Sequence, residues 1–209
     1  MRVLRLFVFL KNRIIRTLSE IAAPKMIWGY KRYDGMVLDN TRISSSTYIG
    51  TSSRLDIEDN VFVCHFNVID ASGGLCIETG CQLTNFITVQ THSSHRSIRL
   101  YGAHYKSIQD PIGYVKGGVR IGEYTFVGPH TTIMPGTTIG KGCIISAHSY
   151  LNGNYPDFSV IRGVPARVVG NTQEMDKPFL LDHPELDIYY REWATDANTS
   201  EAFPVKVRT

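Results

Sequence analysis

Residues 91–95 of the sequence, Thr-His-Ser-Ser-His, place two imidazoles in one short polar segment. Imidazole titrates near neutral pH, so a histidine in such a segment can remove a proton from an attacking hydroxyl group. Upstream, Asp70 adds a carboxylate that can accept hydrogen bonds from two hydroxyl groups at once. Base chemistry at His92 depends on the elements that hold these side chains in place.

The elements that hold these side chains are indicated by an aliphatic residue at every sixth position through the middle of the chain. A helix would repeat its apolar face every 3.6 residues and a plain strand every two, so this period favours a short strand followed by a tight turn. Three such hexads would form one triangular coil of about 18 residues, with the aliphatic side chains inside a narrow prism. The repeated positions are Ile121, Val127, Ile133, Ile139, Ile145 and Leu151, preceded by Ile77, Leu83, Val89, by Ile57, Val63, Ile69, and by a weaker start at Val37, Ile43, Ile49, Leu55.

Two breaks in this register indicate where the chemistry lies. The step from Ile69 to Ile77 contains two extra residues, and a much longer step follows Val89, so that residues 90–118 leave the prism as one excursion loop. Long loops on a rigid scaffold are usually functional. His92 stands at the root of this excursion, which supports its prediction as a general base.

The repeats and the Thr-His-Ser-Ser-His segment resemble the hexapeptide-repeat acyltransferases, in particular the maltose/galactoside and polysaccharide O-acetyltransferase branch. The resemblance covers residues 37–170 and implies an all-β solenoid, a left-handed parallel β-helix. It implies acetyl-CoA as the acyl donor and a sugar hydroxyl as the acceptor, in surface-polysaccharide biosynthesis. It also implies that the first histidine of the motif, His92, is the catalytic base, and that the protein is a homotrimer with its sites at subunit interfaces.

The binding residues follow from the same resemblance. The stretch 65–70 corresponds to acceptor-binding positions, and the excursion supplies one more contact; these residues are His65, Asn67, Asp70 and His95. The coenzyme would lie against turns in the second half of the prism, at Gly128, Pro129, Ala147, Arg162, Pro165 and Arg167, where a guanidinium group suits phosphate oxygens. The sequence departs from the family twice: His65 replaces an asparagine, and Pro129 has no N–H to offer a developing oxyanion.

Other functions stay open on this fold. An antibiotic (xenobiotic) acetyltransferase, an N-acetyltransferase of an amino-sugar nucleotide and a non-catalytic scaffold would all share the repeats. The seven histidines lack the spacing of the three-histidine zinc site found in carbonic anhydrases of the same architecture, so no metal is expected.

The charge divides the chain into three parts. Residues 1–33 carry eight bases and one acid, residues 34–170 carry ten of each, and residues 171–209 carry four bases and eight acids. The neutral middle argues against a nucleic-acid partner. We therefore expect a basic amphipathic helix and cap over residues 1–36, the acyltransferase domain over 37–170, and a short acidic extension over 171–209.

The N-terminal segment offers two interpretations. Its apolar and basic residues alternate with helical spacing over residues 3–21, which fits an interfacial helix on an anionic membrane and equally a helix that caps the open end of the prism. No apolar run reaches the roughly 18 residues of a membrane-spanning helix. With four cysteines and no paired spacing among them, a reducing cytoplasm is the expected setting, with residues 1–22 as a candidate peripheral contact to the membrane.

Overall fold

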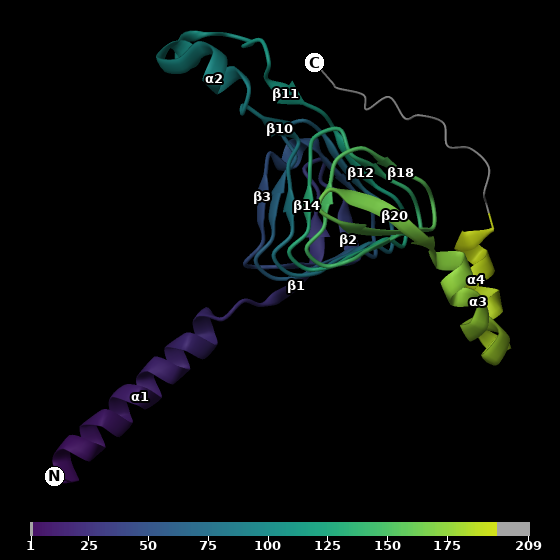
Figure 1. Ribbon diagram of the computed structural model, residues 1–209. Coiled ribbons are helices and arrows are strands. Elements are labelled where there is room, and N and C mark those ends of the chain that lie inside the picture. Colours follow the sequence, from purple (N-terminus) through teal and green to yellow (C-terminus); the bar gives the residue numbers. More distant parts are fainter. Residues whose placement is uncertain (1, 196–209) are drawn as a thin grey trace.

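Figure 1 shows the computed structural model, a three-sided prism of stacked coils from which one helix leaves at one end and two helices at the other. The structure describes residues 2–195, with side chains described from residue 9 onward. Within each coil the chain passes through three short strands, and each strand pairs in parallel with the strand of the coil above and below. We name the three faces A, B and C, and the turns between them corners AB, BC and CA.

The faces are one eight-stranded and two five-stranded sheets. Face A consists of β1 (Met26–Lys31), β2 (Val37–Ser44), β5 (Phe62–Val63), β8 (Gln82–Leu83), β13 (Phe126–Val127), β16 (Ile144–Ile145), β19 (Ser159–Gly163) and β20 (Ala166–Asn171). Face B consists of β3 (Tyr48–Gly50), β6 (Val68–Asp70), β9 (Thr88–Val89), β14 (Thr132–Ile133) and β17 (Tyr150–Leu151). Face C consists of β4 (Leu55–Ile57), β7 (Leu75–Ile77), β12 (Val119–Ile121), β15 (Thr138–Ile139) and β18 (Asn154–Tyr155), with the turn η1 (Ser52–Arg54) before β4.

The six-residue repeat is confirmed as the core of the prism. The six consecutive repeat positions are all 0% exposed: Ile121, Val127, Ile133, Ile139, Ile145 and Leu151. Since burial of one such side chain contributes about 1.5–3 kcal/mol, the repeat is also the main source of stability. The weaker start is corrected at its first position, because Val37 is exposed and Leu38 turns inward instead.

Small hydroxyl residues close the corners. After the five anchors from Ile121 to Ile145, the residue four places on is buried and its side chain hydrogen-bonds a backbone carbonyl: these residues are Thr125, Thr131, Thr137, Cys143 and Ser149. Thr131 Oγ1 donates to the carbonyl of Gly128 at 2.7 Å, and Ser149 Oγ donates to that of Ser146 at 2.7 Å. The repeat therefore specifies both the apolar interior of the prism and the side chains that hydrogen-bond backbone carbonyls at its corners.

Antiparallel hairpins close both ends of the prism. At the first coil β1 pairs with β2, and at the last coil β20 folds back on β19. The helix α1 (Arg2–Ala22) lies beyond β1 and projects away from the prism (Figure 1). Its side chains from Phe9 to Ala22 are all exposed, so this part of the helix does not pack on the end of the prism. The strand β1 covers the end of face A because its backbone can continue the sheet, which a helix cannot do.

The excursion is confirmed between β9 and β12. It leaves through β10 (His92–Ser93), forms α2 (Ser97–Tyr101) and η2 (Gly102–Ser107), and returns through β11 (Val115–Lys116), which pairs antiparallel with β10. We call residues 94–114 the excursion lobe. The two short strands at its root hold His92 against the prism while the lobe extends outward (Figure 1).

The C-terminal extension is helical where the structure describes it. It contains α3 (Thr172–Asp182), η3 (Pro184–Leu186) and α4 (Asp187–Ala194); residues 196–209 of the expected tail lie outside the described residues. Trp193 of α4 packs against Tyr124 and Phe158 at corner CA, with ring centroids 4.6 and 5.9 Å apart. The described part of the acidic extension is thus a pair of helices docked on the prism.

Candidate active site

His92 stands at corner BC, where the excursion leaves the prism. Its Nδ1 lies 2.8 Å from Oδ2 of Asp70 and 2.8 Å from Oγ of Ser72. The tautomer that gives the carboxylate a donor carries its hydrogen on Nδ1, which leaves Nε2 with a free lone pair. No described residue hydrogen-bonds Nε2, and the side chain is 42% exposed. The imidazole is therefore held at Nδ1 and accessible at Nε2, as a general base must be.

Asp70 is held by hydrogen bonds on both oxygens. Thr91 donates to Oδ2 through its hydroxyl at 2.6 Å and its backbone N–H at 3.0 Å, and the N–H of Ser72 donates to Oδ1 at 3.0 Å. Burial alone would raise the pKa of Asp70, but these hydrogen bonds outweigh it and hold the pKa well below its usual range. Asp70 is therefore an anion at neutral pH, with Oδ2 facing Nδ1 of His92.

The extra residues between Ile69 and Ile77 make this corner possible. Gly73 donates its backbone N–H to Oγ1 of Thr91 at 2.7 Å. A Cβ at Gly73 would lie 2.4 Å from the carbonyl oxygen of Thr91, a separation that no side chain could adopt without moving the backbone next to His92. The insertion thus supplies Ser72 as a histidine partner and Gly73 as the residue that admits the root of the excursion.

The returning arm of the excursion covers one side of the imidazole. The ring of Tyr114 stacks on that of His92, with centroids 5.8 Å apart and planes 15° apart. Burial, with Tyr105 and Asp70 nearby, raises the pKa of Tyr114, so its hydroxyl stays neutral. His95 lies further out on the lobe, exposed, with Nδ1 2.8 Å from Oγ of Ser93. It does not meet His92 in this arrangement.

Two predicted substrate residues lie elsewhere. Asn67 is 1% exposed at corner AB, where its amide donates to the carbonyl of Cys64 and accepts from the N–H of Ile87. Its side chain is therefore used within the turn, and its contact with a substrate stays a prediction. His65 is at the same corner, with Nδ1 2.6 Å from Oγ of Ser44, and is likewise separated from His92 by face B. Asp70 is brought to the site, but as the partner of His92, facing the imidazole rather than a substrate.

The predicted coenzyme residues share one edge of the prism. Gly128 and Pro129 are at corner AB, Ala147 occupies the same corner one coil later, and the turn after β19 continues this edge, since Gly163 donates to Oγ of Ser149. A Cβ at Gly128 would lie 2.7 Å from the backbone nitrogen of Ala147, so glycine is required there for the coils to stack.

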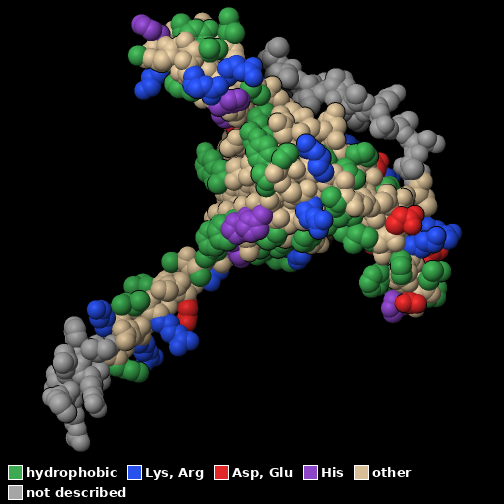
Figure 2. All heavy atoms as spheres, viewed as in Figure 1, with side chains coloured by type: hydrophobic (Ala, Val, Ile, Leu, Met, Phe, Trp, Pro, Cys, Tyr) green, Lys and Arg blue, Asp and Glu red, His purple; other side chains and the backbone are tan. Residues whose placement is uncertain are grey.

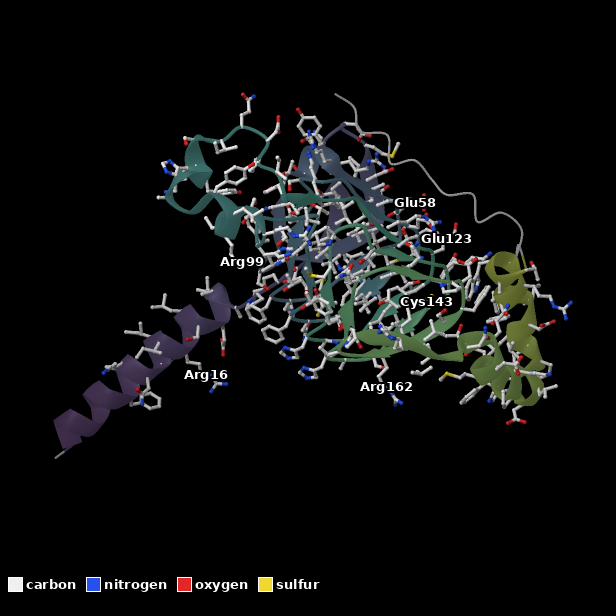
Figure 3. The ribbon with its side chains drawn as sticks, turned by 45° about the horizontal axis from the view of Figure 1, so that its top comes forward. Arg16, Glu58, Arg99, Glu123, Cys143 and Arg162 are labelled. Atoms are coloured by element: carbon white, nitrogen blue, oxygen red, sulfur yellow. The ribbon has the colours of Figure 1, made fainter. Side chains whose placement is uncertain are left out.

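Two guanidinium groups end this edge. Arg162 and Arg167 are directly opposite each other in the β19–β20 hairpin, both exposed, on either side of the turn that contains Pro165. Figure 3 shows Arg162 pointing outward from the prism. Opposed cations without an acidic partner among the described residues suit a phosphate-bearing ligand. Small residues followed by paired arginines therefore fit an extended molecule with a phosphate end, lying along corner AB.

A row of stacked rings along corner AB is a feature that sequence reasoning did not identify. Phe66, Phe86, His130 and His148 stack with neighbouring centroids 5.3, 4.9 and 4.7 Å apart. All four have φ between 58° and 60°, a left-handed conformation that is unfavourable for bulky residues. The recurrence of an aromatic or histidine residue at the same corner position was the available signal.

Other reactive groups are poorly placed for catalysis. Burial raises the pKa of the thiols of Cys76 and Cys81 to about 12 and that of Cys143 to about 11, so these thiols are not nucleophiles at neutral pH. Within residues 2–195, no three histidine, cysteine or acidic side chains gather in a way that could hold a metal ion.

Comparison with known proteins locates the repeats in a family. Residues 118–153 match the model of the bacterial transferase hexapeptide repeats. A 61-residue segment is 44% identical to a probable acetyltransferase of Mycobacterium tuberculosis (strain ATCC 25618 / H37Rv), covering 29% of this chain and 20% of that protein. The chain thus spans about a fifth of the length of this relative.

Two solved structures share the architecture. An N-acyltransferase of Bacillus cereus, crystallised with dTDP and coenzyme A, superposes with a TM-score of 0.52 and 18% identity over 68% of this chain and 89% of that one. A maltose O-acetyltransferase of Clostridium difficile 630 superposes with a TM-score of 0.51 and 20% identity over 61% and 64%. These similarities, together with the observed coils, confirm the predicted fold: the prism is a left-handed parallel β-helix, and residues 118–153 of it match the bacterial transferase hexapeptide repeats.

Proposed function

We propose that this chain is an acetyl-CoA-dependent O-acetyltransferase that modifies a sugar hydroxyl, with His92 as its general base. The observation that supports this most is the imidazole of His92, fixed at Nδ1 by Asp70 and open at Nε2 beside a long excursion. The relatives add support, because the M. tuberculosis protein is named a probable acetyltransferase and the C. difficile structure is a maltose O-acetyltransferase.

The transfer would need only His92, Asp70 and the two substrates. Nε2 of His92 takes the proton of the acceptor hydroxyl as its oxygen attacks the thioester carbonyl carbon. The anionic carboxylate of Asp70 stabilises the imidazolium that results. The carbon–sulfur bond then breaks, and the proton on Nε2 passes to the departing sulfur. The step uses no cysteine nucleophile, in line with the raised pKa of the thiols of Cys76, Cys81 and Cys143.

We propose further that the working unit is a homotrimer. Corner AB, which fits the extended donor, and corner BC, which holds His92, are separated by face B of the same chain. A site that contains both edges is therefore completed by a second copy, and a cyclic arrangement of identical prisms would repeat that junction three times. The four free cysteines fit a reducing, cytoplasmic setting.

The acceptor and the atom acetylated can be tested together. Purified protein would be mixed with acetyl-CoA and a panel of sugars, nucleotide sugars and polysaccharide repeats, and thiol release would be recorded. Mild alkali cleaves an acetyl ester but leaves an acetamide intact, so treatment of the product separates O- from N-acetylation. We expect an alkali-labile product; an alkali-stable product would instead support the amino-sugar alternative, in keeping with the N-acyltransferase neighbour. Absence of thiol release with every acceptor would favour a scaffold.

A further inference from the structure

The helix α1 has an apolar side that nothing in the described chain covers. Its side chains at i, i+4, i+8 and i+11 line one side of the helix and are 47–71% exposed: Leu10, Ile14, Leu18 and Ile21. In a water-soluble chain such a stripe normally packs against a core. Because β1 already closes the end of the prism, this stripe is available to a partner outside the chain.

The charge of α1 indicates what that partner is. The helix carries five basic residues and one acid, and the acid, Glu20, is paired with Arg16 at 3.1 Å. Lys11 and Arg13 have no ion pair with any described residue. An apolar stripe beside unpaired cations is complementary to a lipid surface with anionic headgroups, where apolar side chains enter the acyl boundary and cations meet phosphates. The long stem of Lys11 lets its ammonium reach the headgroups from beside the stripe.

The excursion lobe repeats this chemistry beyond the same end of the prism. Leu100 and Ile112 are 65% and 77% exposed, and Arg96, Arg99 and Lys106 are exposed on the same lobe. Asp110 is the single acid of the lobe. In Figure 1 the lobe, at the upper left, and α1, at the lower left, both extend beyond the end of the prism that carries β1 and β3, and Figure 2 shows apolar and basic side chains together on both. Arg16 and Arg99 are labelled on the two segments in Figure 3.

From these features we propose that α1 and the excursion lobe dock on an anionic membrane surface and hold the His92 corner beside it. No helix in residues 2–195 is long and apolar enough to cross a bilayer, so the contact lies in the interface. The lobe is continuous with the strands β10 and β11 that carry His92, so docking places the catalytic corner near the headgroups. Given the proposed function, the acceptor class is then a glycan held at the membrane by a lipid.

Binding to lipid vesicles tests the docking surface with a charge-matched control. The full chain is mixed with vesicles of phosphatidylcholine alone or with added phosphatidylglycerol, and bound protein is measured by sedimentation. We expect binding to the anionic vesicles only, weakening as salt is raised. The pair Ile14→Glu and Leu18→Glu puts two charges on the stripe, whereas Asn12→Glu and Ser19→Glu puts the same charges on the polar side. The first pair should lose at least about tenfold in affinity, and the second less than about threefold.

The excursion lobe is tested in the same way. Leu100→Glu should weaken vesicle binding, while Ala103→Glu, also exposed on the lobe, should have a smaller effect. The proposal would be overturned if the wild-type protein did not bind anionic vesicles. It would also be overturned if the two α1 pairs lost vesicle affinity equally, or if the two lobe variants did. A change of sedimenting mass in the Ile14→Glu, Leu18→Glu protein would overturn it too, because the stripe would then be a contact between copies.

Acetyl transfer to a water-soluble acceptor separates this proposal from the proposed function. All four variants should keep wild-type thiol release in that assay, because none of the changed residues contacts His92. Loss of vesicle binding with full transfer supports docking and catalysis as separate properties. Vesicle binding without transfer to any acceptor would leave the docking surface standing and refute the enzyme.

Discussion

Oδ2 of Asp70 lies 2.8 Å from Nδ1 of His92, although the two residues are 22 positions apart in the sequence. The parallel pairing of β6 with β9 sets Ile69 opposite Val89, so the residues that follow these anchors meet at the same corner, one coil apart. Asp70 follows its anchor directly, and the excursion root brings His92 back over it. The stacking of coils thus brings two residues that are distant in the sequence within hydrogen-bond distance of each other.

Replacement of the base is the most direct test of catalysis. We expect His92→Ala to lower kcat by about 10²–10⁴-fold, the usual contribution of a positioned general base, with little change in coenzyme A affinity. His95→Ala is the matched control, because it removes the other histidine of the motif at an exposed position without touching Asp70. Steady-state kinetics would measure both. Near-wild-type turnover in His92→Ala would contradict the assignment and move attention to His95.

Asp70 is a positioning residue in this arrangement, and its charge can be removed with little change of shape. Asp70→Asn should lower kcat by about 10²-fold or more, because an amide can favour the wrong imidazole tautomer and does not stabilise an imidazolium. The expected signature is a fall in kcat with KM for acetyl-CoA nearly constant, together with an altered acid limb of the pH–rate profile. If Asp70→Asn changed only the KM of the acceptor, Asp70 would instead contact substrate.

The lowered pKa of Asp70 predicts a particular loss of stability in acid. In the unfolded chain an aspartate titrates near pH 4, whereas the native carboxylate keeps its charge to lower pH. The stabilisation is therefore fully present above that unfolded value and is lost as pH falls toward the native pKa. Urea unfolding between pH 2.5 and 7 should show this loss in wild type and a flatter curve in Asp70→Asn. Asp110→Asn, which removes a carboxylate without hydrogen bonds to the described residues, should keep the wild-type shape.

Gly73 permits the close approach of the excursion root. Gly73→Ala would place a Cβ 2.4 Å from the carbonyl oxygen of Thr91, so the backbone beside His92 has to move. We expect a loss of about 1–3 kcal/mol in the free energy of unfolding and a reduced kcat. Gly50→Ala is the control, since its Cβ would meet only the exposed ring of Tyr48, at 3.3 Å. Thermal unfolding and thiol release would be compared; equal behaviour of the two variants would argue against a strained corner.

A mixture of inactive subunits can reveal a site shared between chains. If His92 comes from one chain and the arginines of corner AB from its neighbour, then His92→Ala and the double variant Arg162→Ala, Arg167→Ala each lack one half. After unfolding and refolding an equal mixture, about a quarter of the junctions would contain both intact halves, because each half is drawn independently from the two subunit types. We expect activity to return to about that fraction. No recovery, or an active monomer by sedimentation, would contradict the shared site.

The sequence by itself determined the prism. Anchors such as Ile121 and Leu151 repeat every six residues, and because each face of a stacked coil admits one inward aliphatic side chain, that spacing is enough to specify the core and the start and end of the excursion. The breaks in spacing also located His92 and the insertion that holds Ser72. These features depend on residues that are close together in the sequence, so the sequence pattern alone can reveal them.

The tertiary structure decided which of these residues meet. Asn67 and Asp70 are three residues apart, yet the turn through face B buries one in corner AB and delivers the other to His92. The position of α1 was equally undetermined, since an amphipathic pattern is the same whether its apolar side covers a prism or a membrane. Contacts across coils depend on register and on the competition between β1 and α1 for the open end, and only the folded chain resolves that competition.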